Sequence, residues 1–457
     1  MPDFLFVISF FLFPWIFYFI HKAADERLLK ISIVNVVFVS LMLFSYFGIF
    51  PLYFGLDEFN NYLKVDNKQI VFKMFVISSL NILFLLIGVL ITRFIFKIKK
   101  RRNFSGPESI NRTQYMLILC LIILSVVTLS RYILKIDEIA IFTLFENGHA
   151  AANIARSKMG NDFPGRYHWY AVFIHQLSYF SSFILLASYL IKREKTVLIL
   201  FFISFSIATF ASIMAIEKGP VVIYFLSLCA VWFLVKKDGR VPLKFTIFML
   251  LGVFFLLAVF GVYFAGAEGL FSGFTAVFSR AFASSISPAY FYLLIFPEYI
   301  GFMYGKTISN PGGIFPYEPF RYTIEVMNWV VPGLKERGIV GSMPTVFWGE
   351  IYVNFNWYVI PLFSFITGIF LALIDWLITK LKYNAITIAF NVWLILFFKN
   401  LAITGFSGFV FSVDFYIVGI AFIVICYFNS ENNKADFYQN STADSSDAKK
   451  SYTSITK

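Results

Sequence analysis

Long apolar runs dominate the pattern of hydrophobic and polar positions. Runs of about 20 apolar residues, separated by short polar stretches, recur along most of the chain. A helix of this length crosses the hydrocarbon core of a bilayer, and the runs lack the alternation that a membrane β-strand requires. The pattern therefore predicts an all-α polytopic membrane protein with about 11 transmembrane helices. The expected spans are 4–21, 31–54, 69–96, 115–135, 168–191, 196–215, 219–235, 245–265, 357–379, 386–403 and 408–428.

Composition agrees with a lipid environment. The chain is 59% hydrophobic and 14% charged, whereas soluble domains carry about 25% charged residues. Cys120, Cys229 and Cys426 stand singly in apolar runs, which is typical of small buried hydrophobic residues and not of a metal site. The net charge of +12 lies largely in short loops between spans, where membrane topology explains it. We therefore expect no nucleic-acid partner.

The short loops define an orientation. Lysine and arginine cluster after the third, fifth, seventh and ninth spans, so they alternate onto one face of the membrane. The positive-inside rule places this face in the cytoplasm. Residues 1–428 then form a single transmembrane domain, and the polar tail 429–457 is expected to be disordered and cytoplasmic. The clustered residues are Lys97, Lys99, Lys100, Arg101, Arg102, Arg112, Lys192, Arg193, Lys195, Lys236, Lys237, Arg240, Lys244, Lys380 and Lys382.

Two long loops, 136–167 and 266–356, fall on the opposite, outer face. The larger one is expected to contain short helices, one over 274–295 that is interrupted near Pro288 and one over 345–354. Topology does not explain the cations in these loops. Arginine and lysine match phosphate oxygens, so a set drawn from both loops predicts a pyrophosphate site; pairing with loop carboxylates is the alternative. The cations are Arg156, Lys158, Arg166, Arg280, Lys306, Arg321, Lys335 and Arg337.

Glu350 stands among aromatic and amide side chains near the outer end of a span. It follows Trp348 and precedes Tyr352 and Asn354. A carboxyl group that is partly removed from water has a raised pKa and serves as a general acid or base. Aromatic and amide neighbours are common in sugar-binding sites, so this stretch predicts sugar chemistry. The alternative is a structural ion pair with a loop arginine.

Two short segments with charged residues interrupt the apolar pattern. Glu217 and Lys218 precede Gly219 in the turn between the sixth and seventh spans. Ionisable groups at membrane depth are costly, which favours a functional role for Lys218, although the two charges also neutralise each other. Lys399 and Asp414 flank a second polar link. We expect them to pair with each other; the alternative is that both contribute to the same functional site.

Motifs for metals, cofactors and nucleotides are absent from the sequence. His168 and His175 share a helix face by their spacing but belong to no metal-ligand pattern. Neither a glycine-rich nucleotide loop nor a nucleophile elbow is present. We therefore expect neither a metal nor a cofactor.

The chain resembles the Wzy-type O-antigen polymerases, the oligosaccharide repeat-unit polymerases of bacterial inner membranes. The resemblance is carried by the turn 216–220 with its basic residue at a helix end, by the stretch 344–356 around Gly-Glu-x-Tyr-x-Asn-Phe, and by the two arginine-bearing outer loops. The Arg-x10-Gly spacing described for some members does not occur at Arg156 or Arg321.

The resemblance implies a multi-pass glycosyltransferase of the bacterial inner (cytoplasmic) membrane. The growing glycan would leave undecaprenyl diphosphate and join an incoming lipid-linked repeat unit at the periplasmic face. Its partners would be undecaprenyl-diphosphate-linked oligosaccharide and the lipid bilayer, with a chain-length regulator protein as a candidate.

From charge alone we expect Arg156, Lys218, Arg280 and Arg321 to stabilise the diphosphate as the bond breaks. Arg166 belongs to the same set of outer cations. Glu350 would orient or deprotonate the acceptor hydroxyl, and Tyr352 and Asn354 would contact sugar.

Two other functions remain open at this point. A flippase for the same lipid-linked sugar also needs basic groups, but along a central cavity, and it often shows internal repeats. An O-antigen ligase shares the layout and the donor but transfers the glycan to a different acceptor.

Overall fold

The computed structural model describes most of the chain, and it is helical nearly throughout. The prediction of an all-α polytopic membrane protein is confirmed. The described residues are 2–24, 27–57, 63–97, 108–160, 163, 167–216, 218–265, 269, 272–273, 275, 278–310, 315–336, 340–410 and 412–428. The predicted tail 429–457 lies outside them.

Ten helices in the described residues are long and apolar enough to cross a membrane, and they correspond to ten of the eleven predicted spans. The remaining predicted span, 245–265, is the helix α12 (Leu243–Ala265). The ten run over Asp3–Ala23, Ile33–Tyr53, Lys68–Ile95, Arg112–Ile133, Tyr167–Lys192, Lys195–Ile213, Gly219–Lys237, Trp357–Lys380, Ala385–Ala402 and Ser407–Phe428.

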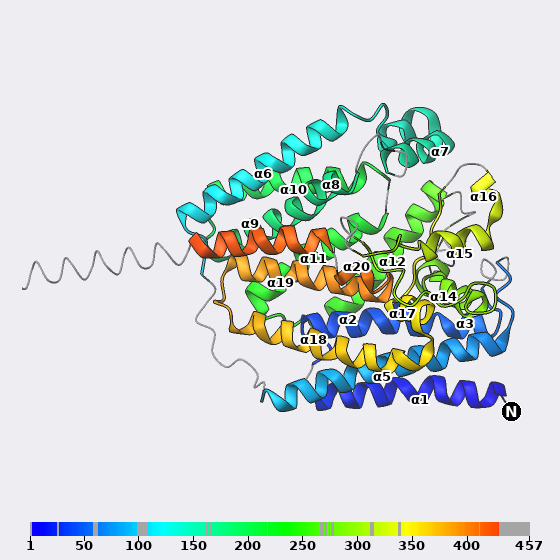
Figure 1. Cartoon of the computed structure of the whole chain (residues 1–457). Coiled ribbons are helices and arrows are strands. Elements are labelled where there is room, and N and C mark those ends of the chain that lie inside the picture. The colour runs from blue at the N-terminus through cyan, green and yellow to red at the C-terminus, as the bar shows by residue number, and fades with distance from the viewer. Residues whose placement is uncertain are drawn as a thin grey trace, which may run out of the picture.

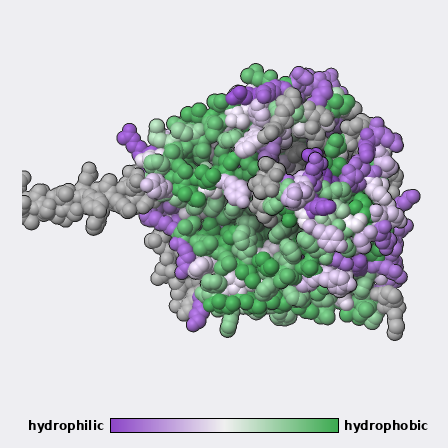
Figure 2. Space-filling model, in the orientation of Figure 1, coloured by the Kyte–Doolittle hydropathy of each residue, from purple (hydrophilic) through white to green (hydrophobic). Residues whose placement is uncertain are grey.

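Figure 1 shows these helices lying side by side, with α1 (Pro2–Ala23) along one edge and α6 (Arg112–Ile133) along the other. The short helices α7 (Ala140–Met159), α15 (Tyr322–Val330) and α16 (Pro332–Glu336) gather at one end, which we call the outer end. Figure 2 shows hydrophobic residues over the middle of the visible face and hydrophilic residues mainly at this end. This distribution is the one that a bilayer around the middle requires.

The helices α5 (Lys68–Ile95) and α18 (Ile360–Lys380) approach each other backbone to backbone. A Cβ atom on Gly88 would lie 2.2 Å from the Phe365 carbonyl oxygen, and one on Gly368 would lie 2.0 Å from that of Leu85. Small residues allow such close packing in membranes, where dispersion contacts and not water release drive helix association. Beside this contact the Ser364 hydroxyl donates to Asn81 Oδ1 at 2.7 Å.

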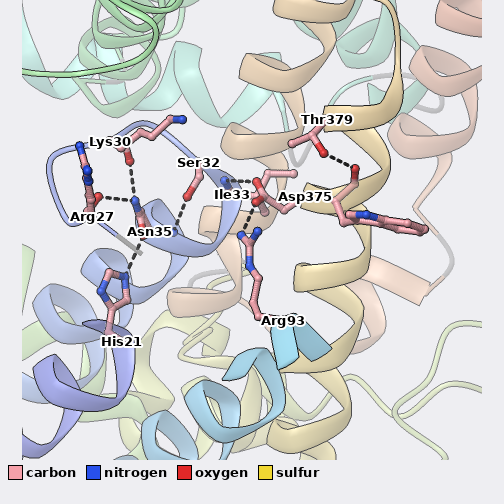
Figure 3. A network of polar contacts seen from close by, with 10 residues as sticks. His21, Arg27, Lys30, Ser32, Ile33, Asn35, Arg93, Asp375 and Thr379 are labelled. Atoms are coloured by element: carbon pink, nitrogen blue, oxygen red, sulfur yellow. Dashed lines mark hydrogen bonds and ion pairs between the residues drawn. The ribbon is translucent and has the colours of Figure 1, made fainter. Parts of the chain in front are cut away.

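A polar network ties the opposite end of this helix pair to α1 and α2 (Ile33–Leu41), as Figure 3 shows. Arg93 Nη2 lies 2.6 Å from Asp375 Oδ2, and both side chains are largely buried. The backbone N–H of Ile33 donates to Asp375 Oδ1. Asn35 Oδ1 accepts a hydrogen bond from His21 Nε2 at 2.8 Å, and Asn35 Nδ2 donates to the carbonyl oxygens of Arg27 and Lys30. Four elements thus meet through buried polar groups that bond to one another.

The structure differs from the sequence prediction inside the two outer loops. Most of 136–167 is the helix α7, which begins where the Ile141 N–H donates to the Met214 carbonyl. The helix expected over 274–295 is not interrupted at Pro288: α14 (Ser284–Ile295) continues through this residue, and nine of its twelve residues are buried. The segment is therefore part of the protein core and not a helix resting in the membrane interface. The helix expected near 345–354 is α17 (Phe347–Phe355).

We predict that Gly368→Ala destabilises the protein, since the new methyl group meets the α5 backbone and the helices must separate. Overpacking of this kind costs about 1–3 kcal/mol. The measurement is the thermal unfolding midpoint of the purified protein. Gly419→Ala is the matched control, because nothing lies within 4 Å of its Cβ position; equal midpoints for both variants would contradict the close contact.

Candidate functional site

The stretch with the strongest sequence signal forms a helix that is enclosed on all sides. Residues 347–354 of α17 are all buried. A short amphipathic helix on a surface would bury only one face, so this helix lies inside the outer end. It packs against α14 and against the following helix α18. Asn356, with φ +73°, ends α17 and directs the chain into the 3-10 turn Trp357–Val359 that precedes α18.

Glu350 lies at the centre of this packing, and only 2% of it is exposed. Its Oε1 accepts a hydrogen bond from the Thr307 hydroxyl at 2.6 Å. Its Oε2 accepts from the Ser407 backbone N–H at 2.7 Å. Burial raises the pKa of Glu350, while the hydrogen bonds from Thr307 and Ser407 lower it. One carboxyl group therefore joins α17 to the segment before α15 and to the start of the last span.

Asn354 extends this arrangement by one helical turn. Its side-chain amide donates to Thr307 Oγ1 at 2.7 Å and to the Glu350 carbonyl at 2.9 Å. Its Oδ1 accepts from the Gly305 N–H at 2.8 Å. The backbone of α17 also accepts two bonds from the same segment, from Met303 and Tyr304. All polar atoms of this amide thus serve to fix the segment 303–307 on α17.

Gly405 and Tyr322 close the space beside the carboxylate. A Cβ atom on Gly405 would lie 2.3 Å from the Tyr322 hydroxyl oxygen and 2.5 Å from Glu350 Oε2. Tyr322 meets Tyr292 of α14 edge to face, with 5.4 Å between ring centroids. The glycine is needed here because the link 403–407 passes directly over the carboxylate, a contact that the sequence pattern did not reveal.

Tyr352 faces a different neighbour. Its hydroxyl donates to the Phe296 carbonyl at 2.9 Å, and Lys73 of α5 lies over its ring at 5.3 Å from the centroid. Burial, with a smaller contribution from Glu298, raises the pKa of Tyr352 to about 12. Tyr352 and Glu350 are therefore both buried residues of α17, but their side chains contact different neighbours and do not form one site.

Two exposed cations each directly precede a residue that lies at the Glu350 cluster, which comprises Glu350, Thr307, Asn354, Gly405 and Ser407. Lys306 precedes Thr307, and Arg321 precedes Tyr322; both side chains are exposed. The Phe320 N–H donates to the Lys306 carbonyl at 2.8 Å, which holds the two segments together. Lys306 is one of the eight outer-loop cations that the sequence pattern did not rank against one another. The backbone bond to Phe320 is the observation that places it next to the segment of Arg321.

Ion pairing with loop carboxylates was the alternative explanation of the outer cations. Within the described residues, no carboxylate lies within 4.0 Å of Lys158, Lys306, Arg321 or Lys335. Arg156, near the end of α7, is exposed but already takes part in an interaction within the protein, so it is not counted with these four cations. These four cations therefore lack a carboxylate partner among the residues that the structure describes, which leaves an anionic ligand as a candidate partner.

Several predicted site residues lie outside what the structure describes. They are Arg166, Glu217 and Arg337, together with the side chains of Lys218 and Arg280. Their placement relative to Glu350 remains a prediction.

The expected pair between Lys399 and Asp414 is wrong. Asp414 Oδ1 lies 3.7 Å from His168 Nε2, and Lys399 donates to Asn400 Oδ1 at 2.7 Å. Lys399 lies near the end of α19 (Ala385–Lys399), where the neighbouring amide is the nearer acceptor. His168 is the second residue of α8 (Tyr167–Ala171), and no pattern in the sequence indicates that it meets the last span.

No group of three or more histidine, cysteine or carboxylate side chains in the described part of the chain has the geometry of a metal site. Comparison with protein-family models, with characterised proteins and with solved structures gave no match for this chain. The candidate site therefore rests on its own geometry.

We predict that Gly405→Ala disrupts the Glu350 cluster, since its methyl group meets both the carboxylate and the Tyr322 hydroxyl. Displacing a buried, hydrogen-bonded carboxyl group costs on the order of 1–3 kcal/mol. Thermal unfolding of the purified variant measures the loss. Gly408→Ala, three residues further on and with nothing within 4 Å of its Cβ position, is the control. A Gly405→Ala variant as stable as the control would show that the link does not press on Glu350.

Proposed function

We propose that this protein is a repeat-unit polysaccharide polymerase of the O-antigen type. It would transfer the growing glycan from undecaprenyl diphosphate to an incoming lipid-linked repeat unit at the outer face of the bacterial inner membrane. The observation that supports the proposal is the exposed pair Lys306 and Arg321, which adjoins the Glu350 cluster in the chain at the outer end. Neither cation has a carboxylate within 4.0 Å in the part of the chain that the structure describes.

The chemistry suits this arrangement. A glycan on a lipid diphosphate is already activated, so the enzyme must stabilise the charge on the leaving diphosphate as the glycosidic bond breaks. Arginine presents a planar fork to phosphate oxygens, and lysine adds a compact charge. Lys306 and Arg321 supply one of each at the end of the helices, where a lipid anchored in the bilayer presents its head group.

The geometry gives Glu350 a role that differs from the first expectation. A general base must reach the hydroxyl that it deprotonates. Both oxygens of Glu350 accept hydrogen bonds from the protein, and it is nearly inaccessible to solvent. In this proposal Glu350 is a positioning residue: it holds the segments that carry Lys306 and Arg321 at a fixed distance from the last span.

We predict that Arg321→Gln and Lys306→Gln leave the protein in the membrane but reduce polymerisation by about 10²–10³-fold, because charge stabilisation of the leaving group is lost. A glycan gel should show single repeat units in place of a ladder. Lys158→Gln is the matched control, since Lys158 is an exposed cation on α7 that has no carboxylate within 4.0 Å among the described residues. This variant should form a ladder close to that of the unsubstituted protein.

The same gel distinguishes the cations that stabilise the diphosphate from the positioning residue Glu350. Arg280→Ala, whose role follows from charge alone, should behave as Arg321→Gln does. Glu350→Gln retains an acceptor for Thr307 but places an amide where the Ser407 N–H donates, so it should lower both protein stability and ladder length. Normal ladders in Arg321→Gln, Lys306→Gln and Arg280→Ala together would refute the site.

A further inference from the structure

The loop that follows α11 (Lys218–Lys237) is a rigid turn at the end of the molecule opposite Glu350. Asp238 and Gly239 have φ values of +52° and +73°. The Arg240 N–H donates to the Lys237 carbonyl at 2.9 Å and closes the turn. Two successive residues with positive φ between a carbonyl and an N–H three residues apart are the signature of a type I′ turn, for which Asp-Gly is a preferred sequence.

A second loop holds this turn in place. The Ile31 N–H donates to the Gly239 carbonyl, and the Val241 N–H donates to the Leu29 carbonyl, each at 2.8 Å. Lys30 and Arg240 face each other in this antiparallel bridge. The loop 27–31 is itself fixed by Asn35, as Figure 3 shows. The backbone that carries Lys237 and Arg240 is therefore preformed and does not need a ligand to order it.

A surface pocket of about 520 Å³ opens on this turn. Asp238 supplies its carboxylate, and this group already lies 4.0 Å from the Lys30 ammonium. Lys236 donates to the Leu190 carbonyl at 2.7 Å, which anchors its side chain. Neither Lys237 nor Arg240 has a carboxylate within 4.0 Å among the described residues. The lining residues are Lys236, Lys237, Asp238, Arg240, Val241 and Pro242.

Apolar surface adjoins the pocket on the membrane side. Trp232 of α11 is 41% exposed, and Leu243 and Phe248 of α12 are 58% and 71% exposed. The two helices meet here through Phe233 and Phe245, whose ring centroids lie 4.8 Å apart. A ligand with an anionic head and apolar chains would place its head on the turn and its chains along this surface. Free phosphate could bind to the cations of the turn but would leave the adjoining apolar surface uncovered.

We propose that this pocket binds the phosphate head group of an anionic phospholipid, with Lys237 and Arg240 as its ligands and the exposed faces of α11 and α12 along its acyl chains. Each basic residue near an anionic lipid surface favours binding by roughly a factor of five. The positive-inside rule accounts for the sign of the charge at this end. It does not account for a preformed turn that places Lys237 and Arg240 in one pocket, with no carboxylate within 4.0 Å of either in the described part of the chain. This site is independent of the proposed polymerase activity.

The test is lipid binding to the detergent-purified full chain, followed by native mass spectrometry and by thermal stability. The probes are phosphatidylglycerol, phosphatidylethanolamine and inorganic phosphate. We expect phosphatidylglycerol to bind and stabilise the protein, and the other two to do so far less. K237Q/R240Q should weaken phosphatidylglycerol binding on the order of 10- to 30-fold.

The control K97Q/K380Q removes two charges at the same end of the bundle but outside the pocket, and should change binding less than about threefold. Equal stabilisation by inorganic phosphate would replace the lipid with a free anion and overturn the proposal, as would equal binding of phosphatidylethanolamine. An equal loss of phosphatidylglycerol binding in K97Q/K380Q would show that general surface charge explains the binding, and this would also overturn the proposal. If K237Q/R240Q does not purify as a single species, K237Q and R240Q are measured separately, and unchanged binding in both refutes the site.

Discussion

The contact between α5 and α18 is the constraint on which the rest of the structure depends. It joins residues 68–95 to residues 360–380, and so connects the first part of the chain to the last. Gly88 and Gly368 remove side-chain volume where the two backbones meet, and the Arg93–Asp375 pair fixes the register at one end. A buried ion pair of this kind contributes more to specificity than to stability, because desolvation offsets most of the attraction. In a membrane, where water release does not drive association, such directional contacts decide which helices pair.

The outer end follows from this scaffold. The helix α17 precedes α18 in the chain, separated from it only by the turn Trp357–Val359. Its buried residue Glu350 accepts hydrogen bonds from Thr307 and from Ser407. Glu350 and Asn354, one helical turn further on, thus hold the segment 303–307 on α17, together with the backbone bonds from Met303 and Tyr304. The backbone that carries the exposed cations Lys306 and Arg321 is thereby held at the outer end, as the proposed binding of a lipid-linked diphosphate would require.

The spans and the helix near Glu350 could be predicted from the sequence because helix length and continuous apolarity are local properties. The burial of Glu350 could not, since it depends on Thr307 and Ser407, which are distant in the chain. The same limit explains the error at Asp414: sequence proximity favoured Lys399, whereas His168 reaches it across the fold. Continuation of α14 through Pro288 was missed because a proline signals a break only where neighbours do not support the helix.

The proposed polymerase joins lipid-linked glycans at its outer end without a nucleotide sugar, and reconstitution tests this proposal. The purified protein in liposomes is supplied only with undecaprenyl-diphosphate-linked repeat units, and the lipid-linked products are separated by length. We expect a series of lipid-linked oligomers that differ by one repeat unit. Movement of single units across the bilayer without any joining would contradict it and would indicate a flippase.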